Sequence, residues 1–177
     1  MDKKATREYL SHVIREIKDK GNKSFIIRER LYPRLRKHKV IALYMALKDE
    51  VNLDDLIVRL INEKKTVVIP KMVNGGLVFY QITDIGDVSF SNNSYRIRQP
   101  LGDNEVSKDD IEIMVVPGMG FDKNNNRLGH GKGYYDNYLR EDNNIYTIGV
   151  CFEEQLLEEI PTDDSDVKLN EVITNID

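Results

Sequence analysis

The amino-terminal part of the chain has the apolar spacing of an amphipathic helix. Over residues 3–20, apolar side chains recur about every 3.6 residues, at Tyr9, Leu10, Val13, Ile14 and Ile17. Gly21 follows at a position where glycine commonly ends a helix. A second helical stretch runs from Phe25 to Leu31. We expect it to break or bend at Pro33, because proline lacks an N–H donor and clashes with the preceding turn.

The pattern then changes to short apolar runs that alternate with helical spacing. Residues 40–45 form a continuous apolar run, which is typical of a strand buried on both faces. Asn52 or the residues after it can cap a helix carrying Leu53 to Ile61, and residues 66–69 predict a strand that ends at Pro70. Further strands are expected at residues 77–82, 111–116, 145–150 and 171–174, with a helix near residues 134–140.

This alternation predicts an α/β fold with three layers, in which helices flank a mainly parallel, mixed sheet. No repeat or linker-like segment interrupts it, so residues 1–177 are expected to form a single domain. Ligands of such sheets bind beyond the carboxyl ends of the strands. We therefore expect the chemistry in the loops after Met45, Val116 and Val150.

Composition excludes several classes of protein. One cysteine, Cys151, cannot form an intramolecular disulfide, and no apolar run approaches the roughly 20 residues that span a bilayer. No secretory signal precedes the first helix, so a cytoplasmic protein without a membrane partner is expected. The net charge of −4 divides unevenly, since residues 1–40 hold 13 Lys/Arg and 5 Asp/Glu. A basic first quarter can serve a nucleic acid, an acidic lipid or a phosphorylated ligand, or it can be solvated helix surface.

Glycines crowd the segment that follows the strand at residues 111–116. Residues 118–133 hold five of the 11 glycines, and the run from Arg127 to Asp136 alternates glycine with basic side chains. Glycine permits positive φ and close approach of backbone N–H groups to a ligand, while Arg127 and Lys132 supply charge. The pattern predicts a phosphate-binding segment, against the alternative of a mobile Gly/Asn loop. It matches neither a P-loop nor a G-x-G-x-x-G fingerprint.

These residues carry a family resemblance. The run Pro117–Asp122, followed by Arg127–Asp136, resembles the signature of the 5-formyltetrahydrofolate cyclo-ligases, also called methenyltetrahydrofolate synthetases. Similarity extends over most of the chain, through Lys3 with Arg7, Asp49-Glu50, Ile69-Pro70-Lys71, Gln99-Pro100, Phe152 with Gln155, and Pro161 with Asp166. The resemblance implies a single α/β domain that binds MgATP and a reduced folate.

The same resemblance implies an ATP site. Lys3 and Arg7 are four residues apart, so they project from one helix face and can clamp phosphate oxygens together. Family members use this pair for ATP. The remaining residues carried over to the ATP site are Lys4, Arg127, Gly129, His130, Gly131, Lys132, Gly133, Tyr134 and Tyr135. Arg127, Lys132 and Tyr134 are the residues expected to take part in catalysis.

Metal and folate residues follow by the same carry-over. Asp136 and Asp166 are the expected magnesium ligands, since magnesium is usually held by one or two carboxylates together with phosphate. Glu50 is expected to accept hydrogen bonds from the pterin, and Met45, Tyr134 and Tyr135 to line the folate pocket. Each also has a structural alternative: surface acids for the aspartates, and core packing for Met45 and the tyrosines.

Two positions depart from the family pattern. His130 stands where relatives usually have Arg, and a histidine is only partly charged at neutral pH. Asn170 replaces an acid that commonly lies four residues after the Asp166 position. Because of His130, nucleotide affinity is expected to be weaker than in a chain with Arg at position 130, or to rise on acidification.

The resemblance implies a defined reaction. The formyl oxygen of 5-formyltetrahydrofolate attacks the γ-phosphorus of ATP, N10 closes onto the activated carbon, and phosphate leaves to give 5,10-methenyltetrahydrofolate and ADP. This chemistry needs no protein nucleophile, which suits the single Cys151 in an apolar strand. A monomer is expected. A non-catalytic folate-binding protein stays open as an alternative. A nucleic-acid partner is not expected, because the chain has no recognised nucleic-acid-binding motif and residues 41–177 are acidic.

Overall fold

The computed structural model describes residues 1–91 and 96–176. Its main sheet has six strands in the order β11-β9-β6-β1-β2-β3, all parallel except for the antiparallel pair β2–β3. The strands are β1 (Val40–Ala42), β2 (Thr66–Val73), β3 (Gly76–Ile82), β6 (Ile113–Val116), β9 (Tyr146–Val150) and β11 (Glu171–Ile173). The predicted mainly parallel, mixed sheet is therefore confirmed.

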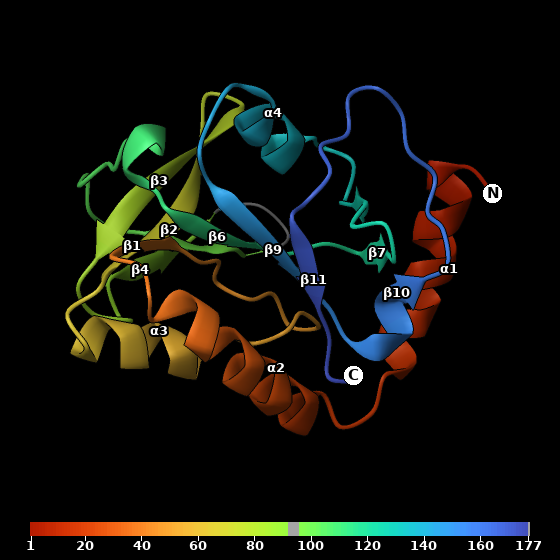
Figure 1. Ribbon diagram of the computed structural model, residues 1–177, viewed down its shortest axis with the longest axis horizontal. Helices are drawn as coiled ribbons and strands as arrows, with labels where there is room; N and C mark the ends of the chain where they lie inside the picture. Colours follow the sequence, from red (N-terminus) through yellow and green to blue (C-terminus); the bar gives the residue numbers. More distant parts are fainter. Residues whose placement is uncertain (92–95, 177) are drawn as a thin grey trace.

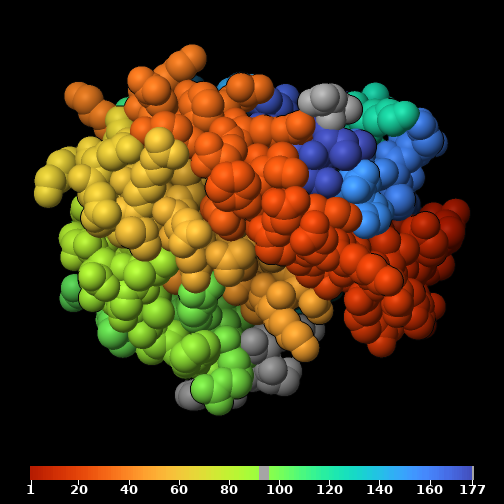
Figure 2. All heavy atoms as spheres, turned by 90° about the horizontal axis from the view of Figure 1, so that it is seen from below, coloured from red at the N-terminus to blue at the C-terminus, as the bar shows by residue number. Residues whose placement is uncertain are grey.

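Helices cover both faces of this sheet. The helices α2 (Lys20–Leu35) and α3 (Asp54–Asn62) pack below it, and α4 (Tyr134–Arg140) packs above it (Figure 1). Viewed from below, α2 and α3 lie side by side across the molecule (Figure 2). Strand residues alternate between the two cores, because Ile41 and Val67 face α2 and α3 while Ala42 and Val68 join the core that includes Leu139 of α4. The three-layer prediction is confirmed.

A smaller unit stands at one end of the main sheet. The strands β7 (Gly120–Asp122), β8 (Arg127–Leu128) and β10 (Leu156–Leu157) form a three-stranded sheet, against which α1 (Lys3–Glu16) packs through Leu10. The remaining elements are the pair β4 (Val88–Phe90) and β5 (Arg98–Pro100), and two 3₁₀ turns at Lys108–Asp110 and Glu153–Gln155. The glycine-rich segment expected as one loop therefore contains the hairpin β7–β8.

Three predicted boundaries are wrong. The first helix ends at Glu16 rather than near residue 20, and Gly21 lies inside α2. The left-handed turn between the helices is made by Asp19, whose φ is 61°. Helix α2 continues through Pro33 to Leu35 although proline has no N–H to donate, and the N–H of Arg36 still bonds to the Tyr32 carbonyl at 3.0 Å.

The third wrong boundary is the end of the second strand. Strand β2 continues past Pro70 to Val73 and is paired with β3 from Val67 to Val73. Strand β1 pairs with β2 only as far as Val68, so Pro70 lies beyond the part of β2 that is bonded on both sides. Proline is tolerated at such positions because its missing N–H breaks no ladder bond.

The uneven charge of the chain is partly compensated by ion pairs across the fold. Basic side chains of the first quarter form ion pairs with acids from later segments: Lys20 with Asp49, Lys23 with Glu153 and Glu154, Arg28 with Asp55, and Arg34 with Glu171. Part of the positive charge of residues 1–40 is thus paired with acids of the same chain. Among the described residues, no helix combines the length and apolar character that a bilayer-spanning segment needs.

Candidate active site

A cleft of about 520 Å³ opens between the end of the main sheet and the amino-terminal helix. Its walls come from α1, the segment after β1, the β2–β3 hairpin, β5, the segment from Pro117 to Asp136, and the turn at residues 163–166. The loops after Met45 and Val116, where the chemistry was expected, therefore both line this cleft. The loop after Val150 does not line it; instead Gln155 donates a hydrogen bond of 2.9 Å to the carbonyl of Met119 and supports the wall from behind.

One end of the cleft is a glycine segment held by an arginine from another element. Nε of Arg7 donates to the carbonyl oxygen of Gly129 at 2.8 Å. Gly131 and Gly133 have φ values of 110° and 72°, in the region that favours glycine. A β-carbon at Gly131 would lie 3.6 Å from Cζ of Arg7. The backbone of residues 129–133 and the guanidinium of Arg7 thus form one surface suited to an anion.

Arg127 is the most buried of the basic residues that line this cleft. It is only 8% exposed, and its Nε donates to the carbonyl of Pro117 at 2.6 Å. Its guanidinium lies 5.1 Å from the ring centre of Tyr135. Burial lowers the pKa of Arg127, while the carboxylates of Asp136, Glu50 and Asp166 raise it. Since arginine stays protonated even when buried, the cleft contains a fixed positive charge between acids from several elements.

His130 sits in the same group of cations but contributes less charge. Burial lowers its pKa, and the nearby guanidinium groups of Arg127 and Arg7 lower it further. The charged form of the imidazole is therefore less favourable here than in an unperturbed histidine. Lys132, the next basic residue, is exposed at the rim of the cleft.

Two carboxylates lie beside the glycine segment. Asp136, in the first turn of α4, accepts a hydrogen bond of 3.0 Å from the backbone N–H of Val167. Asp166, the residue before Val167, accepts hydrogen bonds from Nζ of Lys3 and from the backbone N–H of Asp163. The described residues contain no cluster of three or more acidic, histidine or cysteine side chains suited to a metal. A cation here would need further oxygen ligands, such as phosphate and water.

The opposite end of the cleft is more apolar and contains one partly buried acid, Glu50. Oε1 of Glu50 accepts a hydrogen bond of 2.7 Å from the backbone N–H of Leu47. Burial raises the pKa of Glu50, while that hydrogen bond and the charge of Arg127 act in the opposite direction. Tyr44 donates to the carbonyl of Val51 at 2.8 Å, and Met45 is 5% exposed. Glu50 can therefore offer a carboxylate oxygen to a ligand in an apolar setting.

The structure brings together nearly all the residues that the sequence placed at a site. Those lining this one cleft are Lys3, Arg7, Met45, Glu50, Arg127, Gly129, His130, Gly131, Lys132, Gly133, Tyr134, Tyr135, Asp136 and Asp166. Lys4 is the exception, since it is exposed and does not line the cleft. One residue along a helix turns the side chain by about 100°, which carries Lys4 away from the face shared by Lys3 and Arg7.

Several lining residues were missed from the sequence. They are Tyr44, Leu47, Pro70, Met72, Leu77, Ile97, Arg98, Gln99, Pro117, Leu128, Asp163 and Ser165. Pro70 and Gln99 lie within the matched family segments, so that signal could have flagged them. Met72 and Leu77 enter the wall only because β2 and β3 extend as a hairpin beyond the sheet, which strand periodicity does not reveal.

Asn170 has a structural place outside the cleft. Its Oδ1 accepts hydrogen bonds from the backbone N–H and the hydroxyl of Thr147, and its backbone N–H bonds to the same hydroxyl. The amide thus fixes the segment leading into β11 against β9. An acid at this position is not needed to complete the walls of the cleft.

Fold and cleft together define an α/β enzyme in which an anion-binding segment adjoins an apolar ligand pocket. The model of the 5-formyltetrahydrofolate cyclo-ligase family matches residues 2–175. A probable 5-formyltetrahydrofolate cyclo-ligase of Schizosaccharomyces pombe is 36% identical over 159 residues, covering 80% of this chain and 78% of the relative. A 5-formyltetrahydrofolate cyclo-ligase of Mus musculus is 31% identical, covering 76% and 72%.

A solved structure gives the same result. The 5,10-methenyltetrahydrofolate synthetase of Aquifex aeolicus superimposes with a TM-score of 0.86 at 26% identity, covering 100% of this chain and 91% of that one. The chain belongs to the 5-formyltetrahydrofolate cyclo-ligase family.

Proposed function

We propose that the cleft holds ATP at its glycine-rich end and the folate at its apolar end. We also propose that the chain forms one catalytic domain and acts as a monomer. As a member of its family, the protein is an ATP-using ligase of folate metabolism that converts 5-formyltetrahydrofolate to 5,10-methenyltetrahydrofolate. The observation that supports the proposed arrangement is the single cleft lined at one end by Arg7, Gly131 and Lys132, and at the other by Glu50 and Met45.

The triphosphate is proposed to lie along residues 129–133. Arg7 already holds the backbone of this segment through Gly129, so its terminal nitrogens need little rearrangement to reach an anion. Lys132 supplies a mobile charge at the rim, and Arg127 a fixed charge deeper in the cleft. Phosphoryl transfer depends mainly on positioning and on neutralising charge, which these three cations can provide.

Asp136 and Asp166 are the residues that would hold Mg²⁺. Both line the cleft beside the cations, and they are coupled through Val167, whose N–H bonds to Asp136. Two carboxylates that share a site with phosphate fit the ordinary magnesium environment. When bound, the ion would neutralise negative charge on the phosphates.

The pterin ring is proposed to lie against Met45, Tyr134 and Tyr135, with its N–H edge directed at Glu50. One oxygen of Glu50 is oriented by Leu47, which leaves the other to accept from the ring. A bound ligand displaces water from the partly buried carboxylate of Glu50. A ligand whose N–H groups replace the lost hydrogen bonds is therefore favoured over one that lacks such donors. Glu50 is therefore the residue expected to select the pterin.

The proposed chemistry involves the substrate and ATP directly. The formyl oxygen on N5 attacks the γ-phosphorus, and the bond from that phosphorus to the leaving ADP breaks. N10 then attacks the formyl carbon, and the new carbon–nitrogen bond closes the ring. The C–O bond to phosphate breaks, and the departing phosphate takes up the proton that N10 loses. Arg127 and Lys132 stabilise the phosphoryl group as it moves, and Tyr134 helps to position the substrate beside it.

The test is a product assay with the purified protein. In the presence of 5-formyltetrahydrofolate and MgATP, we expect 5,10-methenyltetrahydrofolate and ADP to form in equal amounts. Lys132→Met should reduce turnover strongly, whereas Lys4→Met, the same change at an exposed lysine outside the cleft, should not. Equal activity of the two variants would contradict the proposed position of the triphosphate.

A further inference from the structure

Lys3 is bound to one of the two proposed metal ligands. Its Nζ lies 2.7 Å from Oδ2 of Asp163, 2.8 Å from Oδ2 of Asp166 and 2.9 Å from Oδ1 of Asp166. A single ammonium therefore contacts both carboxylate oxygens of Asp166. The segment between β10 and β11, which carries the two aspartates, runs beside α1 (Figure 1).

Asp166 cannot hold the ammonium of Lys3 and a metal ion at the same time. An ammonium within 3 Å of both oxygens of Asp166 fills the space in which a metal bound to them would lie. Two cations on the same carboxylate also repel each other strongly at such distances. Lys3 must therefore leave Asp166 before that carboxylate can hold a metal ion.

The two backbones are fixed independently of this ion pair, so the side chain can change partner alone. Asp2 caps α1, accepting from the N–H of Ala5 at 2.8 Å, which holds the first turn in place. The turn at residues 163–166 has its own hydrogen bonds, from Ser165 to Asp163 and from Arg140 to the Ser165 carbonyl. Lysine has four rotatable side-chain bonds, which makes such a change of partner easy.

We propose that Lys3 is a placeholder that occupies the metal side of the site until a nucleotide arrives, and that the phosphates then draw Lys3 away and free Asp166. This inference rests on the proposed positions of ATP and Mg²⁺. Its consequence is that the metal binds poorly to the free enzyme and well together with the nucleotide. Because coupling between two ligands is reciprocal, the metal also strengthens nucleotide binding by the same factor.

The test measures metal binding without turnover. Mn²⁺, observed by electron paramagnetic resonance, is titrated into the full-length protein with no nucleotide present. Lys3→Met should bind Mn²⁺ at least about tenfold more tightly than the natural protein, within the range usual for coupled sites. Lys4→Met is the matched control, because it removes an exposed lysine from the same turn of α1, and it should bind Mn²⁺ like the natural protein.

A second titration, with saturating ADP, measures the coupling. The advantage of Lys3→Met over the natural protein should shrink, because Lys3 has then already left Asp166. ADP itself should bind Lys3→Met less tightly, since a phosphate contact is lost. Lys3→Gln, a second neutral variant, should behave in the same way and guards against a folding defect specific to methionine.

The outcomes separate this inference from the proposed function. If Lys3→Met and Lys4→Met bind Mn²⁺ equally without nucleotide, the placeholder is disproved even when the natural protein turns over normally. If the natural protein forms no product, the proposed function fails. The nucleotide-free titration still tests by itself whether Lys3 keeps the metal from Asp166. Tighter Mn²⁺ binding by both Lys3 variants, but not by Lys4→Met, supports it.

Discussion

Arg127 and Gly129 are in such close contact that a β-carbon at Gly129 would lie 2.9 Å from Nη2 of Arg127. The guanidinium is confined there because its Nε is bonded to the carbonyl of Pro117 and one face lies near the ring of Tyr135. The absence of a side chain at position 129 therefore determines where the fixed charge of the cleft lies.

This contact predicts the effect of Gly129→Ala. The added methyl must displace the guanidinium, because 2.9 Å is well inside the normal contact distance. We expect kcat/KM for ATP to fall by at least about tenfold, equivalent to about 1.4 kcal/mol of lost transition-state stabilisation. Gly102→Ala is the control, since it is exposed and has no atom within 4 Å of the added carbon. Equal kinetics of the two variants would show that the position of Arg127 is unimportant.

Glu50→Gln should separate binding from stability. Burial raises the pKa of Glu50, so its ionised form is less favourable in the folded than in the unfolded chain. The stability of the natural protein therefore decreases as pH rises from the ordinary glutamate range through the raised pKa. Glutamine keeps an acceptor for the N–H of Leu47 but carries no charge.

Glu50→Gln is expected to increase stability at high pH and to decrease the affinity for the folate. Its stability relative to the natural protein should be greater at pH 8 than at pH 4, as measured by urea unfolding. The folate should bind at least about tenfold more weakly, because a charge-assisted hydrogen bond is lost. Unchanged affinity for 5-formyltetrahydrofolate in calorimetry would remove Glu50 from the pterin site.

His130 predicts a pH dependence of nucleotide binding. Its pKa is lowered by burial and by Arg127 and Arg7, so the charged form appears only below the ordinary histidine range. A positive charge attracts the phosphates, so ATP affinity should rise as pH falls through that lowered pKa. His130→Gln should lack this part of the rise, and His130→Arg should bind ATP more tightly at pH 7. A pH profile shared by the natural protein and His130→Gln would contradict this role.

Gly21→Ala should stabilise the protein. Gly21 lies in the first turn of α2, it is exposed, and an added β-carbon meets nothing within 4 Å. Alanine is favoured over glycine in helices by about 0.5–1 kcal/mol, so the unfolding midpoint should rise without a change in kcat. If the variant were less stable, the position of Gly21 inside α2 would have to be revised.

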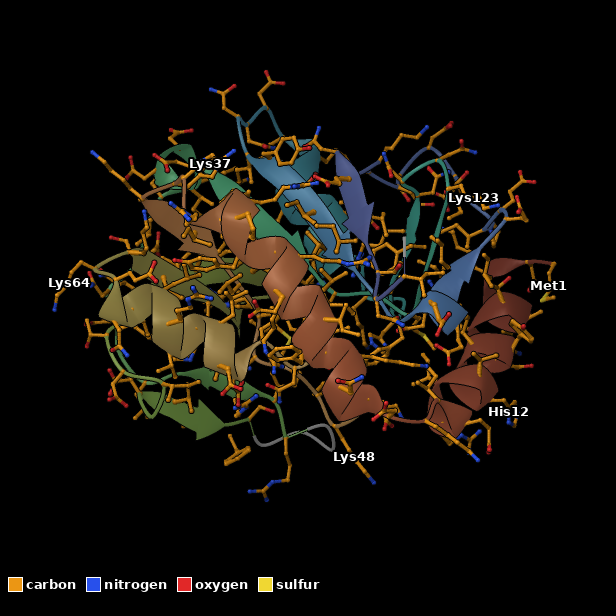
Figure 3. The ribbon with its side chains drawn as sticks, turned by 60° about the horizontal axis from the view of Figure 1, so that its bottom comes forward. Met1, His12, Lys37, Lys48, Lys64 and Lys123 are labelled. Carbon is orange, nitrogen blue, oxygen red and sulfur yellow. The ribbon has the colours of Figure 1, made fainter. Side chains whose placement is uncertain are left out.

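Two histidines and the single cysteine lie outside the proposed site. His12 on α1 is exposed and points away from the body of the molecule (Figure 3). His38 lies 3.6 Å from Glu112, at the end of the segment after α2. Cys151 is fully buried, and burial raises the pKa of its thiol, which makes it unreactive in the folded state. None of these three residues lines the cleft.

The order and type of the main elements follow from local sequence. The helix Tyr134–Arg140 is predicted with its observed bounds, and the apolar runs at residues 113–116 and 146–150 form buried strands. Side-chain periodicity and turn residues act over a few positions, so they can be read along the chain. The proposal that residues 127–133 bind an anion rests in the same way on local sequence, through glycine and basic side chains.

Only the tertiary structure decided which of these side chains meet. Lys3 contacts Asp166 across 163 positions, and Arg7 bonds to a glycine 122 positions away. Arg127 is predicted from the sequence as a phosphate-binding cation, but its burial follows only from the pairing of β8 with β7. Such contacts depend on strand order and on the packing of α1 against the small sheet. Those long-range interactions leave no periodic trace in a single sequence, whereas local backbone preferences do.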